Sequence, residues 1–436
     1  MGKLSYSRII AIGFFIMILL GTGLLMLPVS SQSGLWTDFP EAFFTAVSAQ
    51  CVTGLTVVDT ASHWSLFGQL VILLLIQTGG LGFISIGVFF SIMLKRKLKL
   101  SQRGLFQESM NTLEISGVSR LTKRIMKGVF LFEFSGAILL LPSFLKTYPV
   151  HKAVYYSVFH SVSAFCNAGF STLDGNLINM YDDIFFNVVI MLLVTIGGLG
   201  FIVWDDLYTN KFNFKRYSLH SKIVLSATVL ITVIGAALLY FTEGGTVLEK
   251  MTLSEKITAA FFGSVTARTA GFNTFDLAGM SDAGKLIMMV IMFIGGSPGS
   301  TAGGIKTTTF VVILVFVMSN FKKTQPNIFG KRLEDDSVRK ATTVFATNFS
   351  LVVISSVILS IITDVGLTDI LYETVSAIST VGVSSVGTAS YGRMGAYLIA
   401  SLMYMGRVGS MTFAVSFFEK RKKEVVSYMP EKISIG

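Results

Sequence analysis

The sequence predicts an all-α polytopic membrane protein with four tandem copies of one unit, in which a helix, a short pore helix and a second helix follow one another. Three observations support this prediction: low charge, long apolar stretches, and two glycine motifs that recur in a fixed order. Charged residues make up 14% of the 436 residues, against about 25% in soluble domains, and the mean hydropathy is +0.68. The chain therefore has too little charge to cover the surface of a soluble protein.

Several apolar stretches are long enough to cross a bilayer, which takes about 20 helical residues. We expect spans at Ile9–Val29, Phe67–Leu94, Phe185–Trp204, Ile223–Tyr240, Thr342–Ile362, and Ile287–Gly296 together with Phe310–Met318. The first stretch has no small-residue cleavage site and further spans follow it, so we interpret it as a span and not as a signal peptide.

The first recurring motif is a polar segment of about a dozen residues that ends in a glycine, which is too short to span but suits a half-helix that ends inside the membrane. Its four copies end in Val52, Thr53, Gly54; Asn167, Ala168, Gly169; Thr269, Ala270, Gly271; and Thr380, Val381, Gly382. The third copy is one residue shorter than the others before its glycine.

A second glycine motif follows each copy of the first, and its copies begin at Gly79, Gly197, Gly295 and Gly406. Two motifs in a fixed order divide the chain into four units, which we place at 1–100, 101–210, 211–325 and 326–436, the last with a C-terminal tail. Each unit has an even number of spans, so that all four run parallel. An alternating-access transporter with inverted repeats is therefore disfavoured.

Basic residues gather in the connections between the units, for example at 95–99, and in the tail at 420–423. Because cytoplasmic loops are enriched in Lys and Arg, we expect these connections and both termini in the cytoplasm, with the half-helices entering from the outside. The net charge of +10 then reflects this bias, and we expect no nucleic-acid partner.

The glycine-ended stretches predict a single central pore with pseudo-fourfold symmetry. Backbone outside helices is tolerated at membrane depth only inside protein or beside a watery cavity. Carbonyl oxygens directed into such a cavity can replace the hydration shell of a cation, and glycine allows the backbone angles that this requires. The alternative is that these glycines only allow helices to pack closely. Their recurrence after a polar half-helix in all four units favours the pore.

The four glycine-ended sequences resemble the degenerate selectivity-filter sequences of the Ktr/Trk/HKT superfamily of potassium transporters, over essentially the whole chain. With no extra N-terminal pair of spans, the chain is most similar to the Ktr (KtrB/KtrD-like) membrane subunit. The resemblance implies passive, gated K+ conduction into the cell, with K+ held by the twelve filter residues named above. In the HKT branch a serine at the first filter glycine accompanies Na+ preference, so Gly54 favours K+.

The resemblance also implies partners: a homodimer in the cell membrane with one pore per subunit, and a cytoplasmic nucleotide-binding ring of the KtrA/TrkA-like RCK type. This sequence has no dinucleotide fingerprint, so such regulation would come from the ring. We expect no organic cofactor, and Na+ is considered as an activator.

The third copy of the second motif contains proline and clustered glycine, which predict a loop in place of a continuous helix. The alternative is a helix that packs through Gly295, Gly299 and Gly303, which are four residues apart. The resemblance implies that this loop is an intramembrane gate below the filter. Its residues are Gly296, Ser297, Pro298, Gly299, Ser300, Thr301, Ala302, Gly303 and Gly304.

Two cations complete the predicted gate. Arg407 replaces the second glycine of the motif inside the last span, where a charge is costly and usually faces a cavity or a partner. The resemblance places it close to the gate loop, so we assign it to control of the gate. Lys306 follows the loop, and an interfacial lysine is nearly as good an interpretation.

Two other functions are weighed against K+ conduction. A Na+-preferring or Na+-coupled transporter of the same superfamily would share the pore. A membrane-embedded enzyme would need clustered His, Asp, Glu or Cys inside the membrane, whereas the four histidines are scattered singly. We therefore expect that the protein is not an enzyme.

Overall fold

The computed structural model of the chain describes residues 5–94, 100–110, 118–211, 213–409 and 431. The basic clusters at 95–99 and 420–423 lie outside the described residues. The helices and strands of the described residues are all helices apart from one hairpin, made of β1 (Asn327–Ile328) and β2 (Lys331–Arg332). Its turn residues Phe329 and Gly330 both have positive φ, 51° and 74°, as a tight hairpin turn requires. The all-α prediction is confirmed, and the sequence did not reveal this small hairpin.

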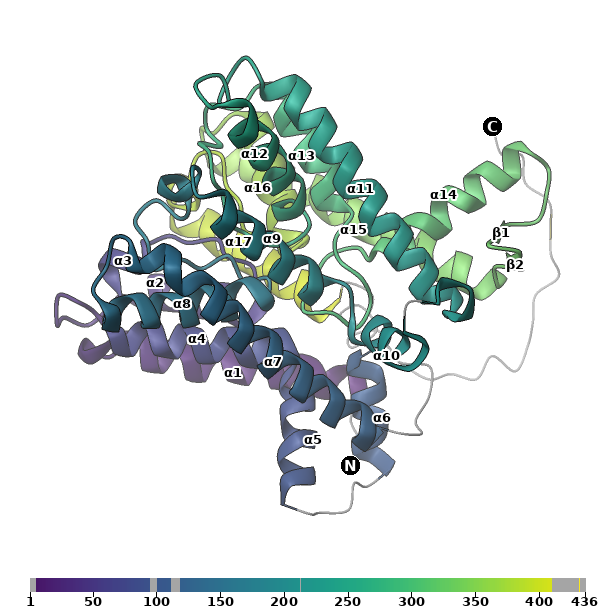
Figure 1. Ribbon diagram of the computed structural model, residues 1–436, viewed down its shortest axis with the longest axis horizontal. Coiled ribbons are helices and arrows are strands. Elements are labelled where there is room, and N and C mark those ends of the chain that lie inside the picture. The colour runs from purple at the N-terminus through teal and green to yellow at the C-terminus, as the bar shows by residue number, and fades with distance from the viewer. Residues whose placement is uncertain (1–4, 95–99, 111–117, 212, 410–430, 432–436) are drawn as a thin grey trace.

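Three kinds of helix recur in the same order four times along the chain. The first kind is long and apolar enough to span: α1 (Tyr6–Met26), α7 (Val118–Leu145), α11 (Leu219–Glu243) and α15 (Asp335–Ile362). The second kind is short: α2 (Phe39–Cys51), α8 (Val150–Phe165), α12 (Leu253–Thr266) and α16 (Leu367–Ile378). The third kind follows the short helix and its glycine-ended segment, and we call it the returning helix: α4 (Leu66–Leu81), α9 (Ile184–Gly198), α13 (Asp282–Phe293) and α17 (Gly392–Val408). One helix of each kind, taken in chain order, makes a set, so that the first set is α1, α2 and α4. In Figure 1 the first set lies at the lower left in purple, and the third set lies at the top in teal.

The four sets form a closed ring. The returning helix of each set packs against the short helix of the next set: α4 on α8, α9 on α12, and α13 on α16. The last returning helix, α17, packs against α2 of the first set. A cyclic order of contacts that closes after four members is what pseudo-fourfold symmetry requires, and it surrounds the C-terminal ends of the short helices with protein.

Sharp bends interrupt two of the predicted spans, Phe67–Leu94 and Phe185–Trp204, so that neither is one continuous helix. α5 (Phe83–Met93) leaves α4 at 89°, and α10 (Phe201–Asn210) leaves α9 at 94°. The bends lie at Gly82 and Gly200, with φ of 73° and 92°, which glycine adopts without steric cost. Because α4 and α9 have only 16 and 15 residues, neither reaches the roughly 20 residues of a full span.

The first glycine of the second motif allows the returning helix to pack closely against a short helix. A Cβ added at Gly79, Gly197 or Gly406 would lie 2.0 Å from a carbonyl oxygen in the last turn of the short helix of the same set. These carbonyls belong to Gln50, Phe165 and Ile378. The motif therefore joins the returning helix to its short helix at the first glycine and, in the first two sets, turns the chain at the last.

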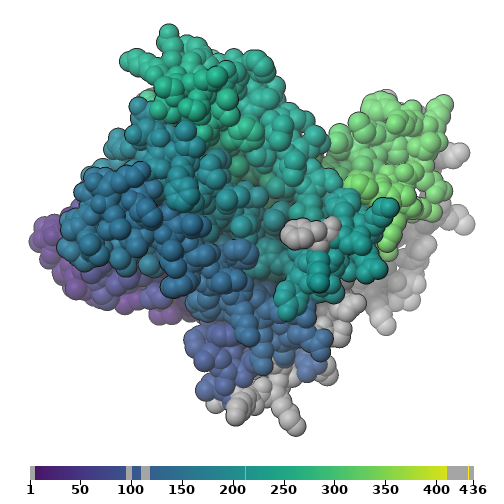
Figure 2. Space-filling model, viewed as in Figure 1, coloured from purple at the N-terminus to yellow at the C-terminus, as the bar shows by residue number. Residues whose placement is uncertain are grey.

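After these breaks the chain leaves the ring. In Figure 1, α5 and α6 (Leu100–Met110) project at the bottom, and α14 (Thr307–Phe321) projects at the right with the hairpin. In Figure 2 the light-green region around α14 forms a lobe set apart from the main body. The interrupted returning helices thus carry the chain from the ring to its periphery.

The close approach at Gly197 gives a stability prediction. Gly197→Ala should destabilise the protein by about 1–3 kcal/mol, because the new methyl group meets a backbone carbonyl that cannot move away. The matched control is Gly23→Ala in α1, where nothing lies within 4 Å of the added Cβ and alanine favours the helix. Thermal unfolding in detergent measures both variants, and equal melting temperatures for the two would contradict the packing role.

Candidate functional site

The four predicted filter segments share one backbone signature. Their first residues, which are not glycines, all have left-handed φ: 56° at Val52, 60° at Asn167, 72° at Thr269 and 51° at Thr380. Their glycines also have positive φ: 100° at Gly54, 69° at Gly169, 76° at Gly271 and 93° at Gly382. The middle residues Thr53, Ala168, Ala270 and Val381 are not left-handed. Alternation between the two hands turns successive carbonyls to the same side of the chain, which is the arrangement that can replace a hydration shell.

The fold brings these four segments together. A Cβ built on Gly54, Gly169, Gly271 or Gly382 would lie 2.6, 2.5, 2.8 or 1.8 Å, respectively, from the backbone of another filter segment. Segments that are far apart in sequence therefore meet at backbone contact distance. A side chain at any of the four positions would clash with a neighbouring segment.

A hydroxyl near the end of each short helix braces the adjoining filter segment. Ser48 accepts a hydrogen bond from the Gly54 N–H at 3.1 Å, and Ser376 accepts one from the Gly382 N–H at 3.2 Å. Ser163 and Thr266 donate instead to carbonyls just beyond the glycine, at 2.8 Å to Phe170 and 2.5 Å to Phe272. The polar character of the half-helices was evident in the sequence, but these four residues were not singled out. The available signal was their spacing, since each lies five or six residues before the filter glycine.

A cavity of about 290 Å³ lies against one end of the predicted filter, on the face at which the short helices begin, which we call the outer face. Gly54, Gly169 and Gly382 form part of its wall together with the loops that follow them. Behind this wall the buried carboxylate of Glu373 accepts hydrogen bonds of 2.5 Å from both Ser384 and Thr388, which line the cavity. Sequence reasoning did not single out Glu373.

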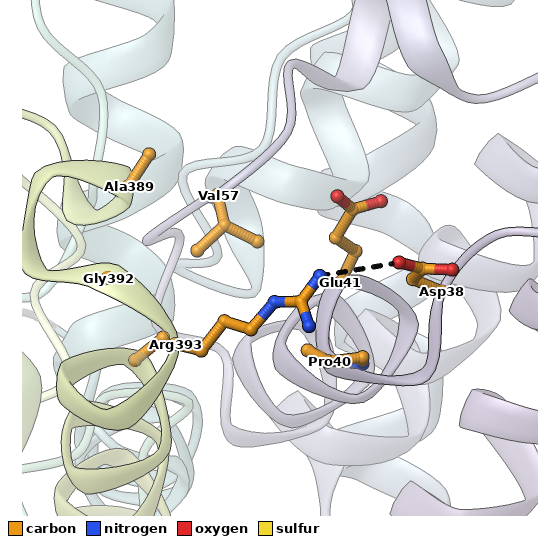
Figure 3. Close-up of a pocket in the computed structure, with 8 residues that line it drawn as sticks. Asp38, Pro40, Glu41, Val57, Ala389, Gly392 and Arg393 are labelled. Carbon is orange, nitrogen blue, oxygen red and sulfur yellow. Dashed lines mark ion pairs between the residues drawn. The ribbon is translucent and has the colours of Figure 1, made fainter.

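The rim of the same face carries a second, smaller pocket of about 190 Å³ between the first and fourth sets. Figure 3 shows Arg393 of α17 reaching across this pocket toward Asp38, which precedes α2, with Glu41 beside them. The Arg393 guanidinium lies 3.6 Å from the Asp38 carboxylate, and both side chains are exposed. An exposed pair of this kind contributes little stability, but it marks the place where the ring closes.

The predicted gate loop lies between α13, which ends at Phe293, and α14, which begins at Thr307. One side of it pairs with the bend of the second set: the N–H of Ser297 donates to Gly198 O at 3.1 Å, and the N–H of Phe201 donates to Gly299 O at 2.8 Å. The remainder lies against the fourth filter segment, because a Cβ at Gly303 would be 2.1 Å from the Thr380 hydroxyl. The loop therefore lies directly beside the inner end of the filter.

Arg407 joins this loop to the first set. Its guanidinium donates to Thr301 O in the loop, to Gly79 O at 2.5 Å and to Gly80 O at 3.0 Å. No carboxylate among the described residues forms an ion pair with it. Lys306 turns back to the loop, where its ammonium group donates to Ala302 O at 2.8 Å. Both predicted cations thus contact loop carbonyls.

Two further buried charges were not predicted to be special. Arg268, in the third filter region, donates to the Thr228 hydroxyl at 3.3 Å, and Glu133 of α7 accepts from Gln77 at 3.2 Å. Both residues are at most 8% exposed. Charged residues inside a membrane protein usually have a partner or a function, and their position within apolar or half-helix sequence could have identified them.

Comparison with known proteins is consistent with this arrangement. The family model of TrkH, described as a cation transport protein, matches residues 7–427. The chain is 41% identical to the potassium/sodium uptake protein NtpJ of Enterococcus hirae, over 100% of this chain and 98% of that protein. It is 37% identical to the Ktr system potassium uptake protein B of Bacillus subtilis, over 97% and 95% of the two chains.

A solved structure has the same fold. The crystal structure of the potassium transporter TrkH from Vibrio parahaemolyticus superposes with a TM-score of 0.74 at 17% identity, and covers 94% of this chain and 85% of that one. The resemblance to the Ktr/Trk superfamily is therefore confirmed. With a family model that matches nearly its whole length and a relative at 41% identity, the chain belongs to the TrkH family of cation transport proteins.

Proposed function

We propose that this chain is the ion-translocating subunit of a K+ uptake system, which conducts K+ passively across the cell membrane through the four filter segments. The observation that carries this proposal is the meeting of four segments with alternating left-handed backbone at one place inside the ring. Relatives named as potassium or potassium/sodium uptake proteins along the whole chain support K+ as the transported ion.

In this proposal, K+ loses its water to the carbonyl oxygens of the twelve filter residues, which run from Val52 to Gly54 in the first unit and at the matching positions of the other three. Hydroxyls of the short helices support the segments by bonding the N–H of the filter glycine or the carbonyl just beyond it. The membrane potential drives entry, since one elementary charge gains about 2.3 kcal/mol per 100 mV. Conduction needs no chemical step and no organic cofactor. The role considered for Na+ is that of an activator.

The loop from Gly296 to Gly304 is the proposed gate. It lies at the inner end of the filter, and its small residues allow rearrangement at low cost. Arg407 holds it by bridging Thr301 to Gly79 and Gly80, and its charge adds an electrostatic barrier to cations. Lys306 supports the same loop through Ala302.

The proposal extends to the wider assembly. We propose units at 1–100, 101–210, 211–325 and 326–436, cytoplasmic termini, a homodimer with one pore in each subunit, and a nucleotide-binding RCK ring on the basic cytoplasmic face. Relatives named as parts of a Ktr system support a multi-subunit assembly.

Uptake of K+ or Rb+ into K+-uptake-deficient cells tests the function. The expressed protein with its regulator should restore growth at low K+, with K+ competing better than Na+ for uptake. Better competition by Na+ would instead support the Na+-preferring alternative, and no rescue from well-expressed protein would count against both.

Gly54→Ser should reduce the preference for K+ over Na+ by about tenfold, because the added side chain meets Ala168 O, 2.6 Å from the Cβ, and displaces filter carbonyls. Competition by Na+ against Rb+ uptake measures this ratio. The matched control is Gly34→Ser, which introduces the same left-handed strain at φ 69° where nothing lies within 4 Å. An unchanged ratio in Gly54→Ser would remove this glycine from the filter.

Arg407→Gln should raise resting K+ flux about tenfold. Hydrogen bonds from a charged donor contribute about 1.5–3 kcal/mol, so their loss increases the population of the conformation in which the loop has moved away from the filter. Arg407→Lys should also raise it, since one ammonium group cannot span both sets of carbonyls. Rb+ flux into proteoliposomes without the regulator measures the effect, with Arg393→Gln as the control at the outer rim. Wild-type flux in both Arg407 variants would contradict the proposal that Arg407 holds the gate loop in place.

A further inference from the structure

The loop after the second filter segment reaches the filter of the third unit. Gly175 and Asn176 in this loop both have left-handed backbone, with φ of 71° and 66°. The left-handed pair turns the chain back, and Asn176 lines the outer cavity beside the filter. Asparagine is one of the few residues other than glycine that adopts this conformation readily.

The side chain of Asn176 contacts a filter carbonyl. Its Nδ2 donates to the carbonyl oxygen of Gly271 at 3.2 Å. The reversed amide would place Oδ1 against that carbonyl, two acceptors face to face, so the donor assignment follows from the bonding pattern. Oδ1 accepts no hydrogen bond from the described residues, which makes the filter contact the one bond that fixes this amide.

The main chain reinforces the same contact. The N–H of Leu177 donates to the carbonyl oxygen of Asn273 at 3.2 Å, so that two successive residues of the second unit clamp the third. Behind them the Ser171 hydroxyl donates to Asn176 O at 3.4 Å, and the buried ring of His160 bonds Ser171 at 3.0 Å. Asn176 is thus held by the second short helix.

The third filter segment differs from its neighbours in a way that makes this clamp useful. It is one residue shorter before its glycine. The glycines of the first and fourth segments, Gly54 and Gly382, bond to serine hydroxyls of their own short helices. In the second and third segments the hydroxyl bonds the carbonyl beyond the glycine, and the Gly271 carbonyl itself accepts a hydrogen bond from Asn176 of the preceding unit.

We propose that Asn176 is a positioning residue for ion specificity, which fixes the Gly271 carbonyl at the outer mouth of the filter from the neighbouring unit. The inference rests on the proposed K+ function and adds a specificity determinant outside the filter sequences. Discrimination between K+ and Na+ depends on the number and orientation of filter carbonyls. Without the hydrogen bond from Asn176, the Gly271 carbonyl can turn toward the smaller ion, Na+. Loss of this bond therefore weakens the preference for K+.

The test measures K+ and Na+ binding to purified protein through the rise in melting temperature with each ion. Asn176→Gly keeps the left-handed backbone and removes the amide. Asn176→Asp keeps the shape and replaces the donor by an acceptor. The matched control is Thr56→Ala, which removes a polar group from the wall of the same cavity without a bond to the filter.

Both Asn176 variants should lower the ratio of K+ to Na+ affinity about fivefold, the effect of one lost hydrogen bond, while Thr56→Ala keeps the wild-type ratio. An unchanged ratio in both variants would overturn the inference. So would tighter binding of both ions by Asn176→Asp at an unchanged ratio, since that would reveal only added negative charge in the cavity. Using both variants guards against a folding defect in either.

The same preparations separate this inference from the proposed function. Wild-type protein that binds K+ selectively but does not transport it would overturn the proposed conduction, and the affinity ratios of the variants would still decide the role of Asn176. Wild-type transport with unaltered ratios in the variants would overturn the role of Asn176 alone.

Discussion

The structure depends on one constraint: backbone outside helices must be enclosed by protein if it lies at membrane depth. Each filter segment has a left-handed residue and a left-handed glycine, so its peptide groups leave the helical pattern where lipid could not satisfy them. The closed ring of returning helices on short helices provides that enclosure. The close approach of Gly79, Gly197 and Gly406 to the short helices allows the ring to close tightly.

Each of the four units contributes one segment to the proposed filter, and the units differ in their second glycine motif. The second motif bends the chain at Gly82 and Gly200 in the first two units, opens into a loop in the third, and carries Arg407 in the fourth. The loop bonds to the second unit and lies against the fourth, while Arg407 reaches the first. At this end of the predicted filter, therefore, one loop and one arginine contact all four units.

The outer side of the ring uses a different contact at each junction between units. The polar pairs, in chain order, are Tyr155 with Gln69 at 2.8 Å, Asn176 with Gly271 at 3.2 Å, Lys285 with Asp369 at 2.9 Å, and Arg393 with Asp38 at 3.6 Å. Among these pairs, the one at the second junction includes a filter carbonyl. Pseudo-symmetric backbone is thus held by side chains that are not symmetric, which makes the four filter segments chemically distinct.

The sequence by itself determined the membrane class, the four repeats, the glycines with left-handed backbone in the predicted filter, and the break before α14. These features depend on local backbone requirements, and glycine and proline record such requirements in the sequence. Only the tertiary structure decided the bends at Gly82 and Gly200, since an apolar stretch has the same composition whether straight or bent. It also decided the contacts of Glu373, Arg407 and Asn176, because a side chain of one unit acquires its partner only when the ring brings another unit beside it.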